Sequence, residues 1–90
     1  MSQGKQISSH IATEALDAIR EMGAAAKRAR MAAGEGQATA AARLGVHVQT
    51  IGRIEAGEPG VAVGHVVGLL FLYGLTTQIA TPGTAESAAP

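Results

Sequence analysis

The segment from residue 37 to residue 57, QATAAARLGVHVQTIGRIEAG, constrains the fold of this chain more than any other. It holds two short helical patterns, residues 37–44 and 48–56, and each is followed by a glycine, which readily adopts the left-handed conformation that ends a helix. Ala41 is small where the two helices would approach each other. The inward-facing apolar positions are Leu44, Val46, Ile51 and Ile54. The segment therefore predicts two short helices packed across a tight turn.

Helical periodicity extends over most of the remaining chain. Apolar residues recur every three or four positions from Ile11 to Ala33, which is typical of one helix face. Ser9 or Thr13 is a candidate N-cap, Gly34 and Gly36 end the pattern, and Gly23 either bends it or divides it into two helices. The chain is rich in alanine, and β-branched runs long enough for a sheet are missing. We expect an all-α domain.

The boundaries of the domain follow from composition. Residues 1–8 are polar and are expected to form a flexible N-terminal arm, without the apolar stretch of a signal peptide. Residues 9–78 carry the helical patterns and form the expected folded domain. Residues 79–90 are small and polar and include two prolines, so we expect a flexible C-terminal tail.

The apolar run at residues 61–75 predicts a last helix at about 64–73. It is shorter than the roughly 18 residues that a membrane span requires, and it contains His65. A buried or dimerising helix is the better interpretation, so no membrane association is expected.

Charge and residue usage limit the classes of function. Formal net charge is zero, but residues 20–57 hold six basic and three acidic residues, which fits either a basic patch for phosphates or an ordinary solvated surface. There is no cysteine, which suits a cytoplasmic protein and excludes a thiolate metal site. His10, His47 and His65 lack the spacing of metal ligands. Serines lie only near the two ends, so a catalytic serine is not expected. Together these observations predict no enzyme, no metal and no cofactor.

The outward side of the second short helix carries side chains suited to reading DNA. Val48, Gln49, Gly52 and Arg53 face away from the apolar positions. Glutamine can pair with adenine, arginine with guanine, and valine can touch a thymine methyl group. Helix, turn and outward polar residues together predict a helix-turn-helix whose second helix, starting at or near His47, enters the major groove of double-stranded DNA.

Residues 22–75 resemble the helix-turn-helix domain of the Xre family, which includes phage Cro and lambda-type repressors. MGAAAKRAR is similar to its first helix, GQATAAARLGV to its second, HVQTIGRIEAG to its recognition helix, and GVAVGHVVGLLFLYGL to its fourth. The resemblance implies a compact, lambda-repressor-like bundle of about five helices without a sheet, and a sequence-specific transcriptional repressor. It further implies that Gln37 contacts a phosphate, that Thr50 contacts the DNA backbone, and that Arg30 and Glu55 form a buried ion pair.

Several residues depart from the family pattern. Glu35 replaces an apolar residue, Gly36 a capping residue and Gly52 a polar one, while Glu58 places a negative charge where some relatives contact phosphate. Alanines replace larger core side chains at positions 26, 29 and 40. These alanines predict a thin core.

A narrower resemblance concerns the segments GEPGVAVG and LLFLYGL, which look like antitoxins that partner HipA-type kinase toxins. Such proteins repress their own operon and hold the toxin inactive. Two alternatives stay open: a phage-type or stand-alone repressor without a toxin, and a helical interaction module with weak DNA binding.

The last helix is expected to use two faces. Val63, Val66, Leu70 and Tyr73 would cover the core, with Leu69 at the border of that face. The opposite side is predicted to form a homodimer interface, made of Gly64, Val67, Gly68, Phe71 and Leu72. The competing interpretation packs this strip on the N-terminal helix, at residues 11–19, within one chain.

Overall fold

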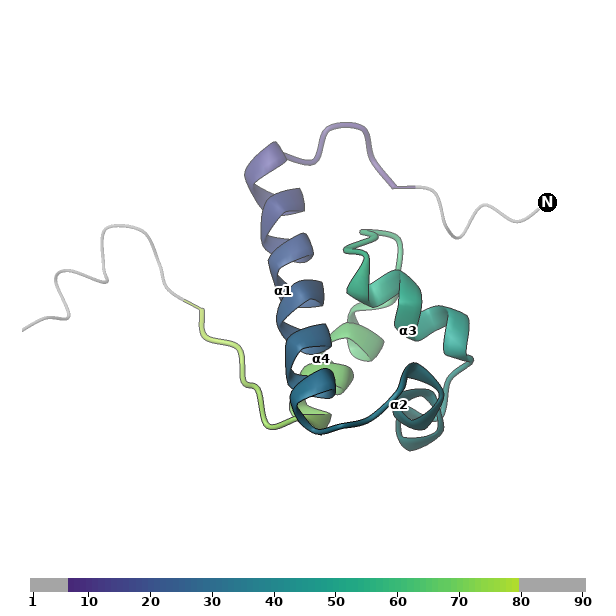
Figure 1. Cartoon of the computed structure of the whole chain (residues 1–90). Coiled ribbons are helices and arrows are strands. Elements are labelled where there is room, and N and C mark those ends of the chain that lie inside the picture. Colours follow the sequence, from purple (N-terminus) through teal and green to yellow (C-terminus); the bar gives the residue numbers. More distant parts are fainter. Residues whose placement is uncertain (1–6, 80–90) are drawn as a thin grey trace, which may run out of the picture.

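Four helices account for the regular structure in the part of the chain that the computed structural model describes, residues 7–79. They are α1 (Thr13–Ala32), α2 (Gln37–Leu44), α3 (Val48–Glu55) and α4 (Val63–Leu72), and no strand occurs in this range (Figure 1). The all-α class is confirmed, and the expected count of about five is corrected to four. The predicted arm and tail lie outside the described residues, except for residues 7, 8 and 79.

The helix count differs because α1 is continuous through Gly23. A Cβ atom on Gly23 would lie 2.1 Å from the backbone oxygen of Ile54, so this glycine allows α1 to approach the end of α3 closely. Ala12 occupies the N-cap position without a side-chain hydrogen bond, so the expectation of Ser9 or Thr13 as cap is wrong. α1 ends at Ala32, Gly34 follows with a φ of +74°, and the Glu35 N–H then donates to the carbonyl of Arg30.

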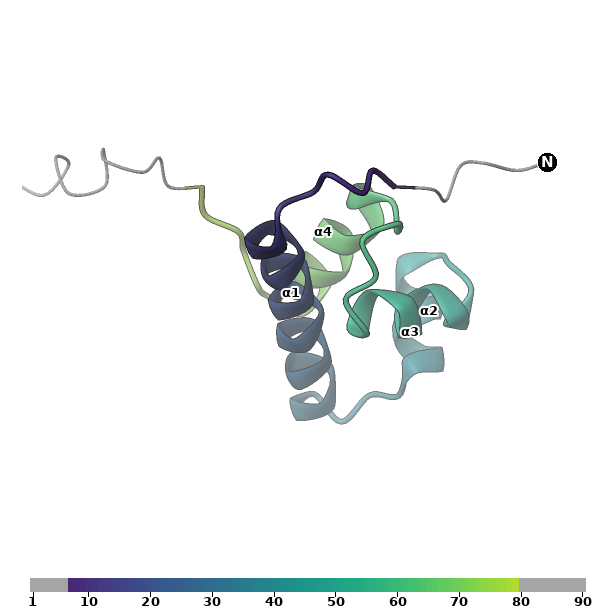
Figure 2. The same ribbon diagram turned by 90° about the horizontal axis from the view of Figure 1, so that it is seen from above.

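α1 runs along one side of the molecule, and α2 and α3 lie together on the other (Figure 1). α3 packs against both α1 and α2, and α4 also contacts both of them. The view from above shows α4 beside the upper part of α1, with α2 and α3 on the far side of the bundle (Figure 2). The segment after α4 turns back, and residues 75–79 line a groove together with α1.

The core is small, as the alanines at positions 26, 29 and 40 predicted. Its buried apolar side chains are Ala26, Ala40, Ala41, Ile51, Ile54, Val66, Leu69 and Leu70. Only Ile51 and Leu69 among the larger ones are fully buried. Leu44 and Val46 are half-buried against this cluster. The helices are therefore held close by small side chains, with little apolar volume between them.

The two faces of α4 are mostly arranged as predicted. Val66, Leu69 and Leu70 are buried, but Val63 is 73% exposed, so its assignment to the core is wrong. Val63 is the first residue of α4 and projects beyond the packed part of the helix.

On the opposite side of α4, Gly64 and Phe71 are exposed, whereas Val67, Gly68 and Leu72 are half-buried. A Cβ on Gly68 would lie 3.1 Å from Leu44 of α2, and Val67 lines a groove with α1. Neighbouring helices within the chain therefore cover the flanks of the predicted strip, while its ridge at Phe71 stays open.

Candidate nucleic-acid interface

The turn between α2 and α3 is built around Gly45, which has a φ of +78°. The N–H groups of Gly45 and Val46 both donate to the carbonyl of Ala41, at 2.8 and 3.0 Å, and close the end of α2. His47 then serves as N-cap residue with extended backbone, and α3 begins at Val48. Two eight-residue helices joined by a three-residue turn form the predicted helix-turn-helix.

α3 separates its apolar and polar residues cleanly. Ile51 and Ile54 are buried against the core. His47, Val48 and Gln49 are exposed, and Thr50, Gly52 and Arg53 are half-buried on the outer side. The structure thus places every residue predicted to meet bases on a surface that a partner can reach.

Gln37, the first residue of α2, lies beside α3. Its Nε2 atom donates to Oε1 of Glu55 at 3.0 Å, so the amide is tied to the end of α3. A Cβ on Gly52 would lie 4.0 Å from the same Nε2 atom. The missing side chain at position 52 therefore leaves the Gln37 amide uncovered.

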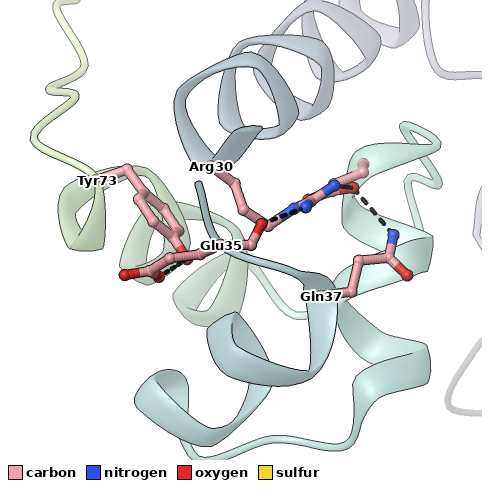
Figure 3. A network of polar contacts seen from close by, with 5 residues as sticks. Arg30, Glu35, Gln37 and Tyr73 are labelled. Atoms are coloured by element: carbon pink, nitrogen blue, oxygen red, sulfur yellow. Dashed lines mark hydrogen bonds and ion pairs between the residues drawn. The ribbon is translucent and has the colours of Figure 1, made fainter. Parts of the chain in front are cut away.

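A buried ion pair connects α1 to the end of α3 (Figure 3). Arg30 Nε donates to Glu55 Oε2 at 2.7 Å and Nη2 donates to Oε1 at 3.0 Å, while Nη1 donates to the backbone oxygen of Glu35 at 2.7 Å. The side chains are only 9% and 4% exposed. Burial raises the pKa of Glu55, but hydrogen bonds from Arg30 and Gln37 outweigh it and leave this pKa below its ordinary value. The pair holds α3 at a fixed angle to α1.

A second polar cluster surrounds Glu35, between α1 and α2. The Tyr73 hydroxyl donates to Glu35 Oε1 at 2.7 Å, as Figure 3 shows, and Arg43 Nη1 donates to the same atom at 2.8 Å. The Arg43 guanidinium also lies over the Tyr73 ring, 5.3 Å from its centroid. The hydrogen bonds from Tyr73 and Arg43 lower the pKa of Glu35, and burial with the Glu35 contact raises that of Tyr73. The cluster joins the ends of α2 and α4.

Sequence reasoning missed this cluster. The unusual carboxylate at position 35 was a signal, but its partner Tyr73 lies 38 residues further along the chain. No local pattern could connect the two residues.

All five arginines form ion pairs with carboxylates. Those of Arg20, Arg28, Arg43 and Arg53 involve exposed or partly exposed side chains, with Asp17, Glu21, Glu35 and Glu58 as their respective partners. The excess of positive charge in residues 20–57 is therefore largely compensated locally, which fits the ordinary solvated surface better than a basic patch.

Residues 7–79 hold neither a membrane-spanning helix nor a cluster of metal-binding side chains. Across residues 7–79, no helix has both the length and the hydropathy needed to cross a bilayer. Three or more side chains capable of holding a metal ion do not come together anywhere in this range.

Comparison with known families identifies a domain family that this chain matches. A family model described as a helix-turn-helix domain matches residues 21–80, two thirds of the chain, from the middle of α1 past the end of α4. No curated protein and no solved structure matches the chain.

Proposed function

The chain belongs to the helix-turn-helix domain family, and we propose that it is a sequence-specific transcriptional repressor that reads its operator with α3. The observation that carries the proposal is the outward face of α3, where Gln49 is exposed and Arg53 half-buried beside the exposed Val48. A repressor acts where the DNA is, so we assign the protein to the cytoplasm.

The proposed contacts divide into two kinds. Gln49 would pair with adenine, Arg53 with guanine, and Val48 with a thymine methyl group, so these three supply sequence preference. Contacts to phosphate and sugar position the helix without reading sequence. We assign those to Gln37, His47 and Thr50, which lie at the starts of α2 and α3.

The test begins with selection of preferred duplexes from a randomised library by the wild-type protein. Gln49→Ala and Arg53→Ala are each expected to weaken binding to the selected duplex by about 1–3 kcal/mol. Arg28→Ala is the matched control, because its side chain is exposed and lies outside α3. Unchanged affinity in both α3 variants would show that α3 does not read the groove.

We further propose that the repressor is a homodimer joined through α4. Phe71 is 55% exposed, one turn after Val67, which lines an apolar groove of about 550 Å³ between α1, α4 and residues 75–79. In a two-fold dimer the same surface meets itself, so each Phe71 can enter the groove of the partner subunit. Pairing would also present two copies of α3 to half-sites about 34 Å apart.

Sedimentation at micromolar concentration tests this interface. The wild type is expected to be a dimer and Phe71→Glu a monomer. Met31→Glu is the matched control, because Met31 is 60% exposed and does not line the groove. A monomeric wild type, or a Phe71→Glu protein that stays dimeric, would remove this assignment.

The narrower resemblance extends the proposal to an autoregulating antitoxin that binds a HipA-type kinase toxin. Its support is the sequence of residues 57–64 and 69–75. Co-expression with a kinase-like neighbouring gene, followed by pull-down, is expected to recover a complex. Without a complex, a stand-alone repressor is the better description. If the library selection also fails, the chain is a helical interaction module.

A further inference from the structure

Arg53, proposed above to read guanine, carries an ion pair of its own. Its Nε atom lies 3.1 Å from Oε1 of Glu58, just beyond the end of α3, and the two side chains are 36% and 50% exposed. An exposed pair of this kind contributes little to stability. Its position matters more, because it places a carboxylate on the only arginine of the recognition helix.

The backbone fixes this pair in place. The Glu58 N–H donates to the carbonyl of Arg53 at 3.0 Å, and Gly57 between them has a φ of +79°. Gly57 is buried against α1, where a Cβ on it would lie 2.7 Å from Cγ of Arg20. The turn therefore cannot move toward α1, and Glu58 stays close to Arg53.

We infer that Glu58 is a specificity-determining residue. Its carboxylate disfavours contacts of Arg53 with phosphates of any sequence, and leaves Arg53 free to bind a guanine. This inference rests on the proposed function. A phosphate offers Arg53 mainly charge, and the Glu58 carboxylate would be repelled by it. The guanine edge is uncharged and offers two acceptors, O6 and N7, to one guanidinium. The other four arginines are paired as well, and they lie on α1 and α2. Arg53 is therefore the arginine whose ion pair most affects binding through α3.

The experiment compares wild type, Glu58→Gln and Asp17→Asn on two duplexes, one selected by the wild type and one of random sequence. Glu58→Gln keeps the shape of the side chain and removes its charge. Asp17→Asn is the matched control, since Asp17 forms a similar exposed pair with Arg20 on α1 and does not line the proposed dimer groove. Affinities are measured by fluorescence anisotropy between about 50 and 200 mM salt, the range in which phosphate contacts show their salt dependence.

Glu58→Gln is expected to bind the random duplex about fivefold more tightly, the effect of removing one unit charge at about 4 Å from a phosphate when both charges stay fully solvated. Its salt dependence on that duplex should steepen by about 0.9 in log–log slope, equivalent to one additional phosphate contact. The selected duplex should gain less, so that the ratio of the two affinities falls. Asp17→Asn should leave this ratio unchanged.

Two results would overturn the inference while leaving the proposed function intact. One is an equal gain in affinity of Glu58→Gln on both duplexes, and the other is the same loss of selectivity in Asp17→Asn. If the wild type selects no sequence at all, the proposed function fails and the inference fails with it. Melting curves of the three proteins verify that the variants are folded.

Discussion

Replacing Glu55 with alanine would leave the Arg30 guanidinium buried without its counter-charge. The side chain of Arg30 is 9% exposed, and the change removes two of its hydrogen bonds, of 2.7 and 3.0 Å. Bonds to charged groups contribute about 1.5–3 kcal/mol each. The summed contribution of the two bonds agrees with the loss of about 3–5 kcal/mol found when one partner of a buried ion pair is removed.

That loss is large for this domain. Typical stabilities of about 0.05–0.15 kcal/mol per residue give roughly 4–11 kcal/mol for a domain of the size of residues 7–79. At about 4–8 °C per kcal/mol, Glu55→Ala should lower the melting temperature by at least roughly 12 °C. Circular dichroism at neutral pH measures it, with Glu21→Ala as control because that side chain is 73% exposed.

A double variant separates charge from packing. Arg30→Met with Glu55→Leu removes both charges and should recover much of the stability, because no unpaired ion stays buried. A Glu55→Ala protein with the same melting temperature as Glu21→Ala would refute the reasoning. A double variant as unstable as Glu55→Ala would show that the loss does not come from the unpaired arginine.

Gly23→Ala should destabilise the protein by about 1–3 kcal/mol in urea unfolding, because its Cβ would lie 2.1 Å from the Ile54 oxygen and α1 must shift. Gly52→Ala should stabilise it by about 0.5–1 kcal/mol, because this helical position has ordinary space for a Cβ; a lower melting temperature would contradict this. Acid should unfold the protein: the lowered pKa values of Glu35 and Glu55 mean that the unfolded chain binds more protons below about pH 4.3. The stability that these carboxylates contribute is fully present above that pH, and it is lost as the pH falls through their pKa values in the folded protein. Glu55→Gln should make this loss of stability with falling pH shallower, as measured by melting curves over a pH series.

Local patterns predicted the centre of the molecule well. α2 matches its predicted range of 37–44, and α3 begins where predicted and ends one residue early. Both helices are delimited by glycines and by apolar spacing within the same few residues. The outward position of Gln49 follows from the same periodicity, since the buried positions Ile51 and Ile54 determine which side of α3 faces out.

Features that depend on distant residues could not be predicted. Gly23 looks like a helix breaker until the carbonyl of Ile54 is seen against it. Val63 fits the apolar spacing of α4, but periodicity does not show where along a helix the core stops. Counting charges showed an excess of basic over acidic residues in residues 20–57, but the carboxylate that pairs with each arginine depends on the fold.

The alanine core restricts how this sequence can diverge. In most domains a core position tolerates several apolar residues of similar volume. Here Ala26 and Ala40 have no exposed surface, so almost every replacement adds atoms where neighbouring helices already touch. Homologues that keep the same helix spacing should therefore retain a very small residue at positions 26 and 40 even after their DNA-facing residues have changed, and that pair of sites can trace descent when the recognition surface no longer does.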